Sequence, residues 1–202
     1  MLLKIHPDNP SPRHIKTVVD TLAKGGVIIY PTDTVYGLAC DIYNPRAIDK
    51  ITMIKGIKKK EANFSFVFND LSQLAEYTKP ISNTVYKIMR KSLPGPYTFI
   101  LNANNKIPRI FQNNKKTVGI RIPENNIPSE IVKELGNPIM TTSIKDEDGL
   151  VEYTTDPELI HEKYKKIVDI VIDGGPGDNQ PSTVIDCTTD EIEIIREGKG
   201  DI

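Results

Sequence analysis

The 202 residues suffice for one substantial hydrophobic core and are short for two, so we predict a single domain spanning residues 1–202. Hydrophobic residues make up 38% of the chain and charged residues 26%, the composition of an ordinary globular protein. With a net charge of -1, the chain has no general attraction for polyanions. Affinity for nucleic acid or phosphate would have to come from local clusters of Lys and Arg.

The cysteines and the first ten residues indicate the cellular compartment of the protein. Cys40 and Cys187 are far apart and neither belongs to a Cys-x-x-Cys pair, so we expect reduced core residues and no metal site. Residues 1–10 lack the charged head and apolar run of a signal peptide, and no apolar run approaches the roughly 20 residues that span a membrane. We therefore expect a cytoplasmic protein with no membrane partner.

Helices and strands alternate along the chain. The first helix is expected from Ser11 or Pro12 to Leu22, because its apolar residues recur every three and four positions, and Gly25 and Gly26 end it. Further helices are predicted from residue 44 or 45 to 54 and over 71–77, 81–91, 129–135 and 156–166. Strands are predicted over 27–30, 64–68, 97–101, 117–122, 139–143, 168–172, 182–186 and 191–196. Since the last strands are joined by connections too short for helices, the pattern predicts an α/β domain with a mixed sheet.

The loop after the strand 27–30 is the first candidate site. Pro31 ends the strand, and Thr32, Asp33 and Thr34 then place polar groups together at its carboxyl end. In open α/β sheets ligands bind at that end. The alternative is a tight loop whose hydroxyls and carboxylate satisfy its own backbone.

Basic and hydroxyl side chains form the other candidates. Arg121 interrupts an apolar strand, and because a buried Arg needs a partner, it reaches either an internal carboxylate or an anionic ligand. Ser143 ends a run of three hydroxyls, Ser182 begins a strand and Arg196 ends one. Four lysines follow the second helix, where they suit the negative pole of its dipole without any ligand or could contact RNA phosphates. These are Lys55, Lys58, Lys59 and Lys60.

Several separated motifs in a fixed order resemble the YrdC-like family, and in particular its YciO branch. They are YPTDTVYGLACD, LPGPYTFIL, TVGIRIP, TTS, PSTVID and IREG, and they cover residues from about 14 to 200. The best-known members are threonylcarbamoyl-AMP synthases that act in threonylcarbamoyl-adenosine modification of transfer RNA. The resemblance implies the YrdC-like fold, a twisted mixed sheet with flanking helices and a concave basic surface.

The resemblance also implies substrates and residue roles. In the synthases, threonine reacts with bicarbonate, and the carbamate attacks the α-phosphate of ATP and expels pyrophosphate, with magnesium accompanying ATP and no prosthetic group. Thr32, Arg121 and Ser182 match residues that hold threonine. Lys55, Ser143 and Arg196 match residues around the nucleotide, and Lys55 and Ser143 are the expected catalytic pair.

Two departures from the family pattern leave the activity open. The synthases carry Lys-x-Arg and Ser-x-Asn, whereas here Lys55 is followed by Gly56-Ile57 and Ser143 by Ile144-Lys145. One hypothesis is a threonylcarbamoyl-AMP synthase. The second is a non-catalytic module that binds transfer RNA or double-stranded RNA on the same surface, and the third is a structural or regulatory protein with a vestigial pocket.

Overall fold

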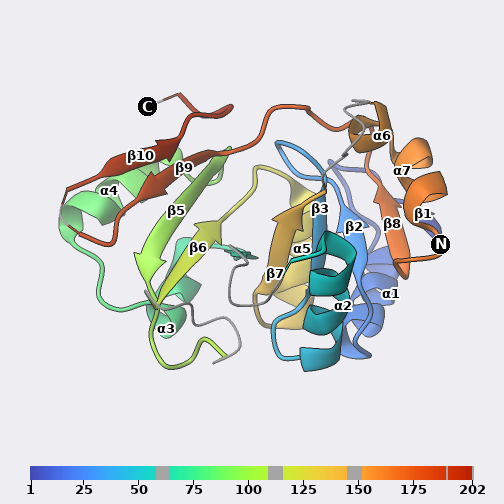
Figure 1. Ribbon diagram of the computed structural model, residues 1–202, viewed down its shortest axis with the longest axis horizontal. Helices are drawn as coiled ribbons and strands as arrows, with labels where there is room; N and C mark the ends of the chain where they lie inside the picture. Colours follow the sequence, from blue (N-terminus) through green and yellow to red (C-terminus); the bar gives the residue numbers. More distant parts are fainter. Residues whose placement is uncertain (58–63, 109–115, 145–151, 190, 202) are drawn as a thin grey trace.

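The computed structural model describes residues 1–57, 64–108, 116–144, 152–189 and 191–201, in which every strand belongs to one sheet (Figure 1). Lys58, Lys59, Lys60 and Lys145 lie outside these ranges. The strands are β1 (Leu2–Lys4), β2 (Ile28–Tyr30), β3 (Gly37–Asp41), β4 (Ser65–Val67), β5 (Tyr97–Asn102), β6 (Thr117–Arg121), β7 (Ile139–Ser143), β8 (Ile170–Asp173), β9 (Thr183–Asp186) and β10 (Glu193–Arg196). The helices are α1 (Pro12–Ala23), α2 (Pro45–Lys55), the 3-10 turn η2 (Leu71–Gln73), α3 (Leu74–Tyr77), α4 (Asn83–Ser92), α5 (Asn126–Leu135), α6 (Glu152–Thr155) and α7 (Pro157–Tyr164).

The sheet is mixed, with the strand order β1-β8-β2-β3-β7-β4-β6-β5-β9-β10. Its parallel pairs are β1–β8, β2–β8, β4–β6 and β5–β9, and the other neighbours run antiparallel. Figure 1 shows β5, β6, β9 and β10 in one half of the sheet and β1, β2, β3, β7 and β8 in the other. The chain between β8 and β9 passes from one half to the other. The predicted α/β fold with a mixed sheet is therefore confirmed.

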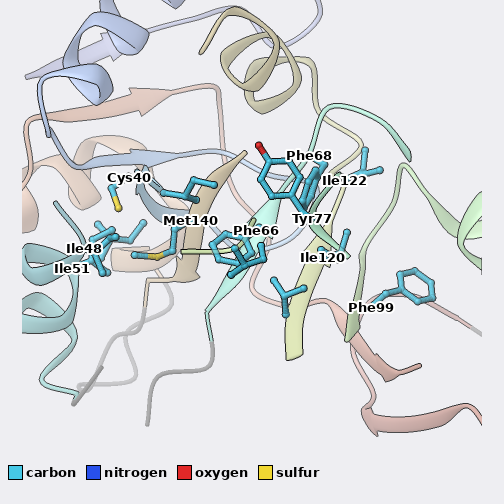
Figure 2. Close-up of a cluster of buried hydrophobic side chains, with 14 of the residues drawn as sticks. Cys40, Ile48, Ile51, Phe66, Phe68, Tyr77, Phe99, Ile120, Ile122 and Met140 are labelled. Carbon is cyan, nitrogen blue, oxygen red and sulfur yellow. The ribbon is translucent and has the colours of Figure 1, made fainter. Parts of the chain in front are cut away.

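The two faces of the sheet are buried under different helices. Because side chains alternate along a strand, Phe66, Phe99 and Met140 share one face (Figure 2). The apolar residues of α2, α3, α4 and α7 cover that face. On the other face, α1 and α5 cover Ile28, Ala39, Val67 and neighbouring residues of β2, β3, β4, β7 and β8. That second cluster includes no residue of β5, β6, β9 or β10, so those strands lack its helical cover.

Local signals explain the ends of α2, which positions one candidate residue. The Asn44 side chain caps the helix by accepting a hydrogen bond from the Ala47 N–H at 3.2 Å, and Pro45 suits its first turn. Gly56 ends it in the left-handed conformation, with φ of 61°. Lys55 is thus the last residue of α2.

Three elements were not predicted from the sequence. β1 and α6 have only three and four residues, too few for a periodic pattern. β3 is a five-residue strand that pairs antiparallel with β2, whereas the sequence pattern predicts no strand there. It begins with Gly37 and contains Ala39, residues of low β propensity, so its strand character comes from its neighbours in the sheet. Cys40 and Cys187 are buried and free, as expected.

Candidate functional site

A cavity of about 550 Å³ opens over the part of the sheet that α1 and α5 leave uncovered. Strands β3, β4, β5, β6, β7, β9 and β10 contribute to its lining, which brings together residues distant in the sequence. Among the candidate residues, Arg121, Ser143, Ser182 and Arg196 line it. Thr98 and Thr141 add two further hydroxyls.

The strand register and small side chains create this space. Ser65 pairs with Thr141 on one side and with Gly119 on the other, so all three positions share one face. A Cβ built on Gly119 would lie 2.7 Å from Ser65 Oγ, and one built on Gly37 would lie 2.7 Å from the Tyr30 ring. Arg121 lies two residues after Gly119 and therefore faces the same side. The glycines keep open the space into which Arg121 points.

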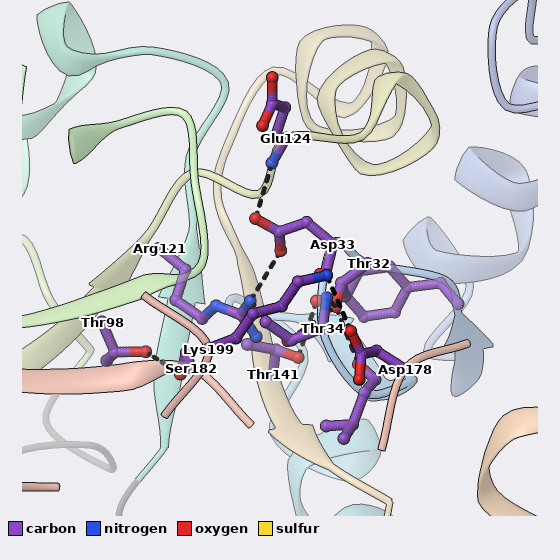
Figure 3. A network of polar contacts seen from close by, with 12 residues as sticks. Thr32, Asp33, Thr34, Thr98, Arg121, Glu124, Thr141, Asp178, Ser182 and Lys199 are labelled. Carbon is purple, nitrogen blue, oxygen red and sulfur yellow. Dashed lines mark hydrogen bonds and ion pairs between the residues drawn. The ribbon is translucent and has the colours of Figure 1, made fainter. Parts of the chain in front are cut away.

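The guanidinium of Arg121 is buried and only partly satisfied (Figure 3). Its Nη2 donates to Asp33 Oδ1 at 3.0 Å and to Thr34 Oγ1 at 2.9 Å. Asp33 Oδ2 accepts a hydrogen bond from the Glu124 backbone N–H at 3.1 Å. Arg121 Nε, in contrast, is buried and has no hydrogen-bond partner in the described part of the chain. Of the two predicted partners, the internal carboxylate is present, and the anionic ligand stays a prediction.

A second guanidinium lies close to the first. Arg196 Nη2 donates to the Ser182 carbonyl oxygen at 2.7 Å, and Ser182 Oγ pairs with Thr98 Oγ1 at 2.8 Å. Burial, followed by repulsion from the Arg121 guanidinium, lowers the pKa of Arg196. The sequence grouped Ser182 with threonine and Arg196 with the nucleotide, but the two residues are in direct contact. Two positive groups in one cavity favour an anionic ligand.

Lys55 and Ser143 meet at the carboxyl end of α2. The Lys55 ammonium donates to the Ser143 carbonyl oxygen at 2.8 Å, which joins α2 to the end of β7. Ser143 lines the cavity, whereas Lys55 is not among the lining residues. The contact keeps the predicted catalytic pair together beside the cavity. Their catalytic role stays a prediction.

Thr32 lies in a neighbouring hollow, lined also by Asp33, Asp178 and Lys199. Its hydroxyl donates to the Val35 carbonyl oxygen at 2.8 Å and accepts from the Thr34 N–H at 3.0 Å. This is the arrangement of a loop whose hydroxyl satisfies its own backbone, the alternative considered for the sequence. The predicted contact of Thr32 with threonine stays a prediction.

Sequence reasoning missed Thr98 and Lys199. Strand alternation could have identified Thr98, because it precedes Phe99 in a strand and must face the opposite side. Lys199 carries no comparable signal, since it follows the last strand in an irregular segment. Its neighbours become evident only in three dimensions.

The described residues contain neither a metal-binding cluster nor a membrane-spanning helix. Within those ranges, no group of three or more His, Cys, Asp or Glu side chains could hold a metal ion. None of the helices in the same ranges is long and apolar enough to cross a membrane.

The Sua5/YciO/YrdC family model, described as "Telomere recombination", matches residues 20–198. The chain belongs to this family. Escherichia coli K12 YciO, an uncharacterized protein, is 40% identical over 200 residues, which are 98% of this chain and 95% of YciO. A putative threonylcarbamoyl-AMP synthase of Methanocaldococcus jannaschii is 35% identical over 204 residues, covering 98% of this chain and 92% of that protein.

Solved structures of Sua5/YciO/YrdC proteins have the same fold. The crystal structure of E. coli YciO superposes with a TM-score of 0.91 and 39% identity, covering 100% of this chain and 97% of that one. P. abyssi Sua5, solved in complex with L-threonine, gives a TM-score of 0.85 at 22% identity over 98% of this chain and 57% of that one, which shows the shared fold alone. The expected membership in the YrdC-like family, near YciO, is confirmed.

Proposed function

We propose that this protein binds L-threonine, bicarbonate and ATP in the cavity and forms threonylcarbamoyl-AMP, the precursor of threonylcarbamoyl-adenosine in transfer RNA. One observation carries the proposal: Arg121 is buried in the cavity with a donor that no described residue satisfies. Membership in a family that contains threonylcarbamoyl-AMP synthases supports this choice of substrates.

The threonine half of the site follows from Arg121. A guanidinium is a strong charged donor to a carboxylate, and Arg121 lines the cavity without a partner for its Nε among the described residues. Because Nη2 is used by Asp33 and Thr34, the guanidinium is fixed in its plane before the ligand arrives. The hydroxyls of Ser182 and Thr98, which bond each other in the free protein, then form hydrogen bonds with the amine and the hydroxyl of the amino acid.

In the nucleotide half of the site, the protein forms no covalent bond to the substrates and acts through its positive charges. The threonine amine and bicarbonate combine to a carbamate and water. A carbamate oxygen then attacks the α-phosphorus of ATP, the bond from that phosphorus to the bridging oxygen breaks, and pyrophosphate leaves. Positioning and cationic groups stabilise such a transfer, and Arg196 and Lys55 supply them here. ATP enters as its magnesium complex, so the metal belongs to the substrate.

Threonine-dependent pyrophosphate release tests the proposal. The protein is incubated with magnesium, ATP and bicarbonate, with and without L-threonine, and the nucleotide product is analysed by mass spectrometry. We expect pyrophosphate and threonylcarbamoyl-AMP in equal amounts, and neither with D-threonine. Equal pyrophosphate release with and without L-threonine would refute the proposal.

Ile57→Arg is expected to raise turnover because it restores the Lys-x-Arg pattern of the synthases. Ile57 is 38% exposed, so an arginine there is not buried in the core. One added cationic donor near the transferring phosphate is typically worth on the order of a hundredfold in rate. Steady-state pyrophosphate release measures the gain, with Met53→Arg as the control because Met53 is exposed on α2. An equal gain in both variants would assign the effect to general charge.

The RNA-binding alternative rests on four lysines. Lys58, Lys59 and Lys60 lie outside the described residues, and the Lys55 ammonium contacts the Ser143 carbonyl oxygen. RNA binding and the concave basic surface therefore stay predictions. A failed turnover assay together with salt-sensitive RNA binding would favour them.

A further inference from the structure

The segment 197–201, here called the C-terminal strap, lies against the start of β9. The Lys199 N–H donates to the Pro181 carbonyl oxygen at 2.8 Å, and the Gly198 N–H donates to Thr183 Oγ1 at 2.9 Å. Thr183 Oγ1 in turn donates to the Gly200 carbonyl oxygen at 2.7 Å. A Cβ on Gly198 would lie 2.3 Å from the Pro181 oxygen, so the close approach requires glycine there. The strap is thus fixed beside Ser182.

The Lys199 side chain links the strap to two other segments (Figure 3). Its ammonium donates to the Asp33 carbonyl oxygen at 2.7 Å and pairs with Asp178 Oδ2 at 2.8 Å. Asp33 follows β2, and Asp178 belongs to the connection between β8 and β9. A hydrogen bond from Lys199 lowers the pKa of the Asp178 carboxyl. A lowered carboxyl pKa keeps the contact present at neutral pH, and it is lost only as the pH falls through that lowered value.

Asp33 connects Lys199 to the cavity. Its backbone oxygen accepts from Lys199, while its carboxylate accepts from Arg121 Nη2 and from the Glu124 N–H. The carboxylate and the Arg121 side chain are each about one-tenth exposed, so little water can replace either partner. A shift of Asp33 would therefore move the Arg121 guanidinium with it.

We propose that Lys199 is a positioning residue for Arg121: it holds Asp33, and through Asp33 it fixes the orientation of the Arg121 guanidinium at the cavity where the ligand binds. This inference rests on the proposed function for the identity of that ligand. Misplacing a binding group by about 1 Å can cost on the order of a hundredfold. Because Lys199 acts through Asp33, the affinity for L-threonine is expected to change while that for ATP does not.

Lys199→Met tests the proposal, since it removes the ammonium and keeps most of the apolar stem. Lys16→Met is the matched control, because Lys16 pairs with Asp20 on the exposed side of α1. The first readout needs no ligand: the 15N–1H signal of Arg121 Nε, assigned by its loss in Arg121→Lys. We expect this signal to shift and its hydrogen exchange to quicken at least fivefold in Lys199→Met alone. An unchanged signal in a folded Lys199→Met protein would overturn the proposal.

The second readout is calorimetric titration with L-threonine and, separately, with magnesium ATP. Lys199→Met is expected to weaken threonine binding about tenfold and ATP binding less than twofold, and Lys199→Arg is expected to recover part of the loss. If the unaltered protein does not bind L-threonine, the proposed function fails, and the Arg121 signal still decides the role of Lys199. Should Lys199→Met not fold, Asp178→Asn replaces it, because it removes the negative charge from one of the two Lys199 contacts and leaves the lysine in place.

Discussion

Arg121→Lys is expected to lower L-threonine-dependent pyrophosphate release by on the order of a hundredfold or more without unfolding the protein. Lysine keeps a positive charge against Asp33, but an ammonium cannot reproduce the planar pair of donors. Removing one preorganised donor from such a site typically costs a hundredfold to a thousandfold in rate. The value of kcat/KM is measured for L-threonine and for ATP, and we expect the larger loss for L-threonine.

The choice of lysine rather than alanine follows from the burial of the ion pair. Arg121→Ala would leave the Asp33 carboxylate buried without its cation, which typically costs about 3–5 kcal/mol of folding free energy. Loss of activity in that variant would not separate binding from folding. Arg13→Lys serves as the control, because Arg13 is exposed on α1. If folded Arg121→Lys binds L-threonine as well as the control does, Arg121 does not hold the carboxylate.

The sequence predicted well those helices whose ends are determined by neighbouring residues. The helix α2 has a capping Asn44 before it and a left-handed Gly56 after it, and both are readable from residue types. The strand β3 has no such signal, because Gly37 and Ala39 become strand residues only through pairing with β2 and β7. The pairing with β7 joins positions about a hundred residues apart. No local pattern encodes that contact.

The same distinction applies to the candidate site. Arg121 was identifiable because a charge interrupts an apolar strand, but its partner Asp33 lies 88 positions earlier in the chain. The sequence therefore left a carboxylate and a ligand as alternatives. The structure contains the first, and Nε has no partner among the residues that it describes. The Thr32 hydroxyl, in contrast to Arg121 Nε, has hydrogen-bond partners within the protein. It bonds within its own loop, which the hydroxyls of such loops do as readily as they bind ligands.

Phe99→Ala and Thr98→Val are expected to separate stability from binding, although they change adjacent residues of β5. Phe99 is fully buried in the core beneath the sheet, while Thr98 faces the cavity and bonds Ser182 Oγ. Truncating a buried Phe to Ala typically costs about 3–5 kcal/mol. For a chain of this length, about 1 kcal/mol corresponds to roughly 2–4 °C in Tm, so Phe99→Ala should melt roughly 6–20 °C lower.

Thr98→Val keeps the shape of the side chain and removes the hydroxyl, so its cost is expected to be about 1 kcal/mol, the net value of one hydrogen bond. Its affinity for L-threonine should nevertheless fall several-fold, because Ser182 Oγ loses the partner that orients it. Phe99→Leu retains most of the apolar volume, so we expect it to recover much of the stability that Phe99→Ala loses. Such a recovery would show that the loss comes from packing. Thermal melting and calorimetric titration of the three variants measure both effects. A stability loss as large in Thr98→Val as in Phe99→Ala would mean that the Thr98 face is packed as core, and the cavity would then have no place for a substrate beside β5.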